Sequence, residues 1–116
     1  MEDRIQTGWL LSFYGPLLTE RQRALLSLYC EEDLSLSEIA LREAISRQGA
    51  GDAVRKATRR LEALEAQLGL VRRYRRLTEG LRACHEDMRD IPGARAREVE
   101  AALGRLLAWE EEEDGV

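Results

Sequence analysis

The sequence predicts an all-helical protein, and three observations support this fold class. Apolar residues recur at intervals of three and four along most of the chain, as on one face of a helix. The 116 residues include only two prolines, and 34% of them are charged, which is typical of helical proteins in water. No segment shows the apolar–polar alternation, bounded by turn residues, that marks a strand. Because this length suits one domain, we expect a single helical domain over residues 1–116.

Two helices are predicted in the first third of the chain. Apolar residues at helical spacing predict a first helix that ends before Gly15-Pro16; they are Trp9, Leu10, Phe13 and Tyr14. Thr19-Glu20-Arg21-Gln22 is a capping box, in which the threonine hydroxyl and the glutamine side chain bind each other's backbone amides. A second helix therefore begins here, and we expect the acidic run Glu31-Glu32-Asp33 to close it.

A helix-turn-helix is predicted next. Ser35-Leu36-Ser37-Glu38 is a second capping box and opens a short helix that ends near Glu43. Only Ala44-Ile45 separates this helix from Ser46, a good N-cap for the longer helix that follows. A short helix, a tight turn with a buried aliphatic residue and a capped longer helix are typical of this motif. We expect the helix-turn-helix to span about residues 35–68.

The long helix has an apolar series with steps of four and three: Ala50, Val54, Ala57, Leu61, Leu64 and Leu68. A second series has the same rhythm: Leu70, Tyr74, Leu77, Leu81, Cys84 and Met88. Because Leu68 and Leu70 are only two residues apart, with Gly69 between them, we expect a break there.

The C-terminal part is expected to contain helices over about residues 70–109. Asp90-Ile91-Pro92-Gly93 is a strong turn signal, and Val99, Leu103 and Leu106 mark a final helix closed by Trp109. An acidic tail follows at residues 110–116. This tail either frays into solvent, since acids are disfavoured at a helix C-terminus, or folds back on a basic segment.

Charge is distributed unevenly along the chain. The formal net charge is −4, but residues 42–76 contain ten bases and four acids, so that this segment is +6 and the remainder is −10. Charge asymmetry of this kind is informative about partners even where the total is not. The basic middle of the chain therefore favours a nucleic-acid partner.

The segments Leu17 to Gln22, Leu28 to Ala40 and Ile45 to Gln48 resemble the YlxM family of small bacterial proteins. The resemblance covers about the first 90 residues. It implies a helix-turn-helix like that of sigma factor region four and a regulatory role in the signal recognition particle pathway, whose components would be partners. The family usually has a glycine where this chain has Ala44, and here Gly49-Ala50-Gly51 opens the long helix.

Candidate nucleic-acid-binding residues lie on the long helix: Arg47, Gln48, Arg55, Lys56 and Arg59. Arg47 and Gln48 are at the helix start, where a docked recognition helix reaches base edges. The other three lie further along and would meet phosphates of duplex DNA or structured RNA. The alternative is that these charges only solvate one face of the helix.

No catalytic residues, cofactor motif or metal site are expected. The chain has one histidine, and Cys84-His85-Glu86-Asp87 are consecutive, so their side chains diverge by about 100° per residue on a helix. Cys30 and Cys84 are expected to be reduced thiols facing the core of a cytoplasmic protein. The sequence has neither a signal-peptide pattern nor an apolar run of about 20 residues, so we expect no membrane insertion.

Two further possibilities concern protein partners. The helices after Gly69 could form a homodimer that presents two helix-turn-helix motifs, or they could pack within one chain. The competing function is a protein–protein adaptor, in which these helices engage a component of the signal recognition particle pathway and the helix-turn-helix serves as a scaffold.

Overall fold

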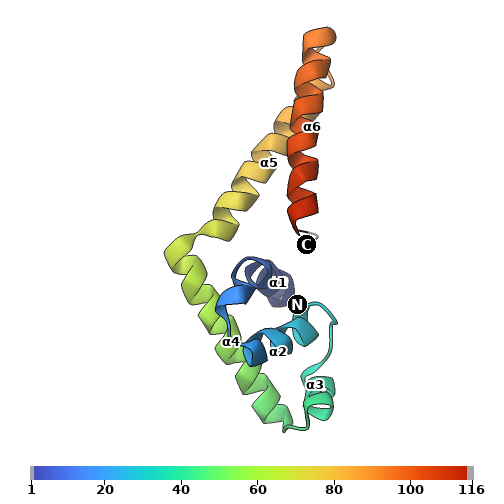
Figure 1. The fold of residues 1–116 in the computed structure, drawn as a ribbon. Coiled ribbons are helices and arrows are strands. Elements are labelled where there is room, and N and C mark those ends of the chain that lie inside the picture. The colour runs from blue at the N-terminus through green and yellow to red at the C-terminus, as the bar shows by residue number, and fades with distance from the viewer. Residues whose placement is uncertain (1, 115–116) are drawn as a thin grey trace. The chain divides into compact units, whose positions relative to one another are not determined.

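A computed structural model describes the backbone of residues 2–114 and the side chains of residues 4–108. The helices in chain order are α1 (Glu2–Tyr14), the short 3-10 helix η1 (Gly15–Leu17), α2 (Glu20–Cys30), α3 (Leu36–Glu43), α4 (Arg47–Leu68), α5 (Leu70–Met88) and α6 (Ala94–Asp114). Figure 1 shows this succession. The described part of the chain contains no strand, which confirms the predicted all-α class.

Hydroxyl groups cap the starts of α2, α3 and α4. The Thr19 Oγ1 and Ser35 Oγ atoms each accept a hydrogen bond from the third backbone amide of their helix, at 3.1 Å in both cases. Gln22 and Glu38 accept from the amides of those two capping residues, which completes both predicted capping boxes. The Ser46 Oγ accepts from the amide of Gly49 at 2.9 Å. Each helix start therefore satisfies amides that have no partner inside the helix.

The turn between α3 and α4 has a left-handed backbone at Ala44, with φ 56° and ψ 46°. The amide of Ile45 donates to the carbonyl of Ala40 at 3.0 Å, which closes the end of α3. The side chain of Ile45 packs against a small core of Leu25, Ile39, Ala40 and Ala50. The predicted turn is confirmed, although its aliphatic residue is only half-buried, and an alanine occupies the conformation that glycine adopts without steric cost.

The contacts divide the chain into two compact units, residues 1–71 and residues 72–116. In the first unit, the largest core cluster joins α1, α2 and α4 through residues such as Tyr14, Leu26 and Leu61, which are all fully buried. The expected single domain over residues 1–116 stays a prediction.

Helix α4 ends at Gly69, which has a left-handed backbone with φ 62°. Its amide donates to the carbonyl of Glu65 at 2.8 Å, and α5 begins at the next residue. This confirms the predicted break. The first amides of α5 are bound by side chains of the first unit: Leu70 donates to the Tyr14 hydroxyl and Val71 donates to the Glu65 carboxylate.

In the second unit, the apolar series predicted for α5 was partly wrong. Leu77 is 69% exposed, and Cys84 is exposed although it was expected to face the core. Three residues of the predicted series, Tyr74, Leu81 and Met88, do lie on the more buried face. Thr78 and His85 take the places expected for Leu77 and Cys84. His85 lies next to Gly104 of α6, where an added Cβ would be 3.4 Å from His85 Nε2.

The predicted turn after α5 is confirmed, since bonds from Arg89, Asp90 and Ile91 to carbonyls three residues earlier end the helix. Arg97 donates to the carbonyls of Met88 and Ile91 and joins this turn to α6. The backbone of α6 continues through Asp114, beyond the expected end at Trp109. Both interpretations of the acidic tail concern side chains outside the described residues.

Candidate nucleic-acid interface

Helix α4 has one buried face and one exposed face. The buried face consists of Ala50, Val54, Ala57, Leu61 and Leu64, as predicted, together with Gly51. Leu68, the last residue of the predicted series, is 45% exposed at the helix end. The opposite face is open to solvent, so a helix that organises the core also presents side chains outward.

Each of the five predicted site residues is exposed. Four of them share the open face: Gln48, Arg55, Lys56 and Arg59. The last three follow Gln48 by seven, eight and eleven residues, which is close to two or three turns of the helix. Arg47 lies in the first turn, directly after the Ser46 cap, and points about 100° away from Gln48. The structure therefore brings four of these residues to one face and places the fifth at its edge.

An acidic residue on this face was missed by the sequence analysis. Asp52 lies between Gln48 and Lys56 on α4 and forms an ion pair with Arg55. Because both side chains are more than half exposed, solvent weakens this pair. Among the described residues no ion pair engages Lys56 or Arg59, and their positive charges remain open to an anionic partner.

Two ion pairs connect the helix-turn-helix to residues that precede the basic segment 42–76. Arg42 of α3 pairs with Glu32 at 3.2 Å, and Arg21 of α2 pairs with Glu43. Glu32 brings one negative charge to residues 42–76 and Arg21 brings one positive charge, so the two pairs together leave the +6 of this segment unchanged. The available charge on α4 comes from Arg47, Lys56, Arg59 and Arg60, which are all exposed.

The two glycines in the first turns of α4 have different surroundings. A Cβ added at Gly51 would lie 3.5 Å from Leu36 Cδ1 of α3, an ordinary contact distance, and 3.3 Å from Nη1 at the flexible end of Arg55. A Cβ at Gly49 would meet only the Ser46 Oγ, at 3.0 Å. Gly51 is thus buried beside α3 with room for a methyl group, whereas Gly49 lies beside the Ser46 cap.

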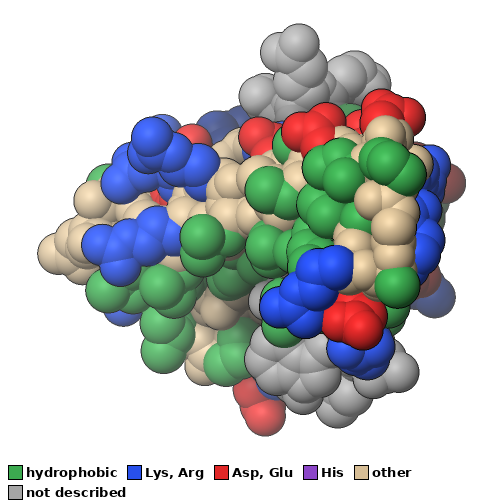
Figure 2. Space-filling view, turned by 90° about the horizontal axis from the view of Figure 1, so that it is seen from above, with side chains coloured by type: hydrophobic (Ala, Val, Ile, Leu, Met, Phe, Trp, Pro, Cys, Tyr) green, Lys and Arg blue, Asp and Glu red, His purple; other side chains and the backbone are tan. Residues whose placement is uncertain are grey.

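Apolar side chains are exposed on both units. Leu41 of α3 is 85% exposed, and Leu77 of α5 lies in a shallow patch beside Arg73 and Arg76. Figure 2 shows apolar side chains at the surface next to those of Lys and Arg. Exposed apolar groups with basic neighbours are suited to contact with another macromolecule.

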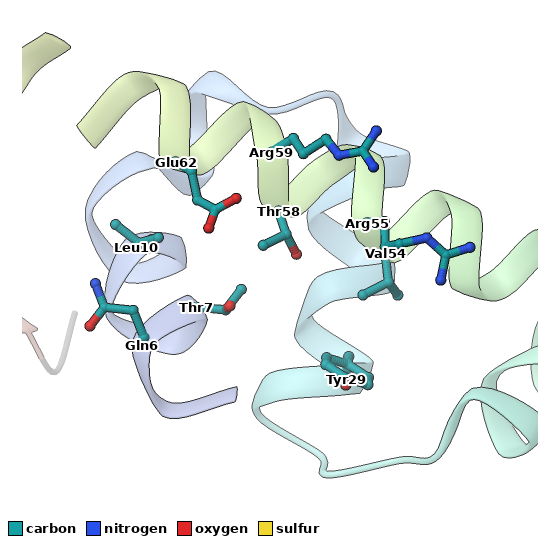
Figure 3. Close-up of a pocket in the computed structure, with 9 residues that line it drawn as sticks. All are labelled: Gln6, Thr7, Leu10, Tyr29, Val54, Arg55, Thr58, Arg59 and Glu62. Atoms are coloured by element: carbon teal, nitrogen blue, oxygen red, sulfur yellow. The ribbon is translucent and has the colours of Figure 1, made fainter. Parts of the chain in front are cut away.

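A pocket of about 320 Å³ lies beside the exposed face of α4 (Figure 3). It is lined by Gln6, Thr7 and Leu10 of α1, by Tyr29 of α2, and by Val54, Arg55, Thr58, Arg59 and Glu62 of α4. In Figure 3, Thr58 and Glu62 point from α4 toward Thr7, while Arg55 and Arg59 extend away from the cavity. This pocket joins residues far apart in the sequence, and nothing in their local pattern predicted it.

An arginine side chain contacts the tyrosine ring that forms one wall of the pocket. The Arg4 guanidinium lies 4.1 Å from the centroid of the Tyr29 ring. Arg4 also donates to Asp33 and to the carbonyl of Leu34, at 2.9 Å in each case. These contacts fix the position of the tyrosine ring before any ligand arrives.

Two features are absent from the part of the chain that the structure describes. No group of three or more His, Cys, Asp or Glu side chains is placed to bind a metal ion there. In the same part of the chain, no helix combines the length and apolar character needed to cross a membrane.

Comparison with known proteins identifies a close similarity. Residues 1–91 match the model of the family UPF0122, described as "Putative helix-turn-helix protein, YlxM / p13 like". A UPF0122 protein of Symbiobacterium thermophilum is 38% identical over 103 residues, which cover 89% of this chain and 96% of the relative. A UPF0122 protein of Clostridium botulinum is 40% identical over 66% of this chain and 70% of the relative. A UPF0122 protein of Geobacillus kaustophilus is 41% identical over 66% of this chain and 69% of the relative.

Proposed function

Since the chain belongs to the UPF0122 family of helix-turn-helix proteins, we propose that it is a regulatory protein that binds duplex DNA or structured RNA through α4. The proposal extends to the five residues Arg47, Gln48, Arg55, Lys56 and Arg59. It also extends to a cytoplasmic role in the signal recognition particle pathway, for which the resemblance to YlxM proteins is the support.

One observation carries the nucleic-acid proposal. The second helix of the helix-turn-helix has an exposed face on which Gln48, Lys56 and Arg59 lie in a row. In proteins with this motif the second helix enters the major groove, and its first residues contact base edges. Gln48 is in that position, whereas Lys56 and Arg59 are two and three turns further along, where phosphates would lie.

Salt dependence of binding tests this function. Affinity for a 20-base-pair DNA duplex and for an RNA hairpin is measured by fluorescence anisotropy between 50 and 300 mM salt. Binding to phosphates releases counterions, so the affinity should fall steeply as salt rises. The double variant Lys56→Gln/Arg59→Gln should bind more weakly and lower the salt slope by about two.

The matched control is Arg82→Gln/Arg105→Gln, which removes two exposed charges from the second unit. It should bind like the wild type. If neither probe binds at low salt, or if both double variants weaken binding equally, α4 is not the interface.

The exposed Leu77 on α5 favours a second candidate, the adaptor. In this function the helices after Gly69 bind the protein component of the signal recognition particle or its receptor. Leu77→Glu should then abolish binding to the purified partner, and Lys56→Gln/Arg59→Gln should leave it intact. Sedimentation of the wild type and of Leu77→Glu also tests the homodimer, since a dimer held by this face would dissociate in the variant.

A further inference from the structure

The pocket between α1, α2 and α4 has the properties of a ligand site. Its volume of about 320 Å³ lies at the lower end of the range of small-molecule pockets. Leu10, Tyr29 and Val54 supply apolar surface, and the contact with Arg4 holds the tyrosine ring in place. A flat, partly apolar group fits between such walls.

The polar side chains that line the pocket determine which hydrogen-bond donors and acceptors a complementary ligand must carry. Glu62 and Thr58 point from α4 toward Thr7 on α1 (Figure 3). An ionised carboxylate only accepts hydrogen bonds, and its two oxygens can accept two adjacent donors, whereas a hydroxyl both donates and accepts. The complementary ligand therefore has two neighbouring N–H donors on one edge and an acceptor elsewhere.

The edge of the pocket carries positive charge. Arg55 and Arg59 are one helical turn apart and extend away from the cavity, onto the face proposed to bind phosphates. A ligand whose ring lies in the pocket and whose anionic groups lie outside would engage both parts. A nucleotide has this layout: a flat base at one end and phosphate at the other.

We propose that the pocket takes one unpaired guanine base, with its N1–H and exocyclic amino groups on the Glu62 carboxylate and its phosphates at Arg55 and Arg59. Guanine presents these two donors side by side. Adenine and cytosine have a single amino group next to a ring acceptor, and uracil has one N–H between two carbonyls. The Thr7 and Thr58 hydroxyls face the acceptors on the rest of the ring.

This inference rests on the proposed function and narrows it. A base can enter the pocket only if it is unpaired, as in a bulge or loop of a folded RNA, where proteins commonly read bases on their exposed edges. The same chemistry is present in a free guanine nucleotide. The experiment therefore needs one probe for each source.

The first probe is an RNA hairpin with a single bulged nucleotide. Hairpins with bulged G, A, C or U, and one without a bulge, are compared by fluorescence anisotropy at a fixed salt concentration. The bulged-G hairpin should bind at least about fivefold more tightly than the others, which is the lower end of the discrimination expected from a good two-donor contact. The second probe is guanosine monophosphate, with the other three nucleoside monophosphates for comparison, titrated while the protein's backbone amide resonances are followed by NMR.

Two variants remove the preference by different means. Glu62→Gln replaces one acceptor oxygen with a donor, and Thr58→Leu fills the pocket with a residue of higher helix propensity, so folding is preserved. In both, the preference for guanine should fall below about threefold. Glu62→Gln should leave affinity for the unbulged hairpin unchanged or raise it, because a negative charge is lost beside the arginines.

The matched control is Glu79→Gln, an exposed acid of α5 in the second unit. It makes the same charge change and should retain the preference for guanine. A preference that is lost equally in Glu62→Gln and Glu79→Gln would overturn the pocket assignment.

The outcomes separate the two proposals. If all hairpins bind with equal affinity and steep salt dependence, nucleic-acid binding stands and the guanine pocket is refuted. If guanosine monophosphate shifts the resonances of Thr7, Thr58 and Glu62 while no hairpin binds, the pocket is a free-nucleotide site and the proposed function fails. If neither probe binds, both proposals fail.

Discussion

The Tyr14 hydroxyl donates a hydrogen bond to Oε1 of Glu65 at 2.6 Å, across 51 residues of sequence. The same hydroxyl accepts from the amide of Leu70 at 3.0 Å, and the amide of Val71 donates to the same Glu65 oxygen at 3.1 Å. Tyr14 is fully buried. One side chain of α1 thus joins α4 to the first turn of α5, where helix amides otherwise need solvent or a cap.

Removing this hydroxyl should destabilise the protein. Tyr14→Phe keeps the ring but leaves a partly buried amide and a carboxylate oxygen each without one partner. The expected loss in the free energy of unfolding is about 1–3 kcal/mol, measured by urea denaturation followed by circular dichroism. Glu65→Gln and the double variant complete a cycle, in which a coupling energy below about 0.5 kcal/mol would show that the two residues act independently.

Stability should also depend on this tyrosine at alkaline pH. Burial, and then the hydrogen bond to Glu65, raise the pKa of Tyr14 above its ordinary value of 10.0. The unfolded tyrosine ionises first, so its contribution to stability is complete below pH 10 and is lost as the pH rises from there through the folded-state pKa. The difference in unfolding free energy between wild type and Tyr14→Phe should be constant from pH 7 to 9 and shrink above pH 10. A difference that stays constant to pH 11 would contradict this expectation.

Glycine at position 44 should stabilise the helix-turn-helix. Ala44 has φ 56°, a region that costs an L-residue with a Cβ about 1–2 kcal/mol. Ala44→Gly removes the clash but adds freedom to the unfolded chain, so we expect a net gain of about 0.5–1 kcal/mol in the free energy of unfolding. Ala63→Gly, on the exposed face of α4, should instead lose about 1 kcal/mol. Equal losses in both variants would refute the argument.

Removing the acid from the exposed face of α4 should strengthen nucleic-acid binding. Asp52→Asn frees Arg55 from its ion pair and removes repulsion from phosphates. Because exposed ion pairs are worth up to about 1 kcal/mol, we expect a gain in affinity of roughly two- to fivefold at low salt. Asp87→Asn, an exposed acid of α5, makes the same change away from α4 and should have no effect. An Asp52→Asn protein with wild-type affinity would argue against contact at this face.

Helix boundaries could be predicted because their signals are local. The Thr19 and Ser35 capping boxes, the Ser46 cap and Gly69 each act within a few residues, and each is found where the sequence indicates it. The rotation of α5 about its axis was not predictable in this way. Apolar content favoured Leu77 and Cys84, whereas the more buried face contains Thr78 and His85, and His85 lies next to Gly104 of another helix, a neighbour that no local pattern indicates.

The candidate site could be predicted only in part. Exposure of Lys56 and Arg59 follows from the helical period once the buried face of α4 is known. The ion pair of Asp52 with Arg55 was visible in principle as an acid three residues before a base. The pocket could not be predicted from the sequence, because it depends on how Thr7 of α1 and Tyr29 of α2 meet Glu62 of α4 in three dimensions.

The hydroxyl caps at Thr19, Ser35 and Ser46 have a consequence for the order in which the chain acquires structure. Each start signal spans four residues, so α2, α3 and α4 can begin to form before distant segments meet. Contacts close in sequence generally make folding fast. We therefore expect these helices to start within each segment as synthesis completes it, whereas the bond between Tyr14 and Glu65 must wait until 51 further residues have been added.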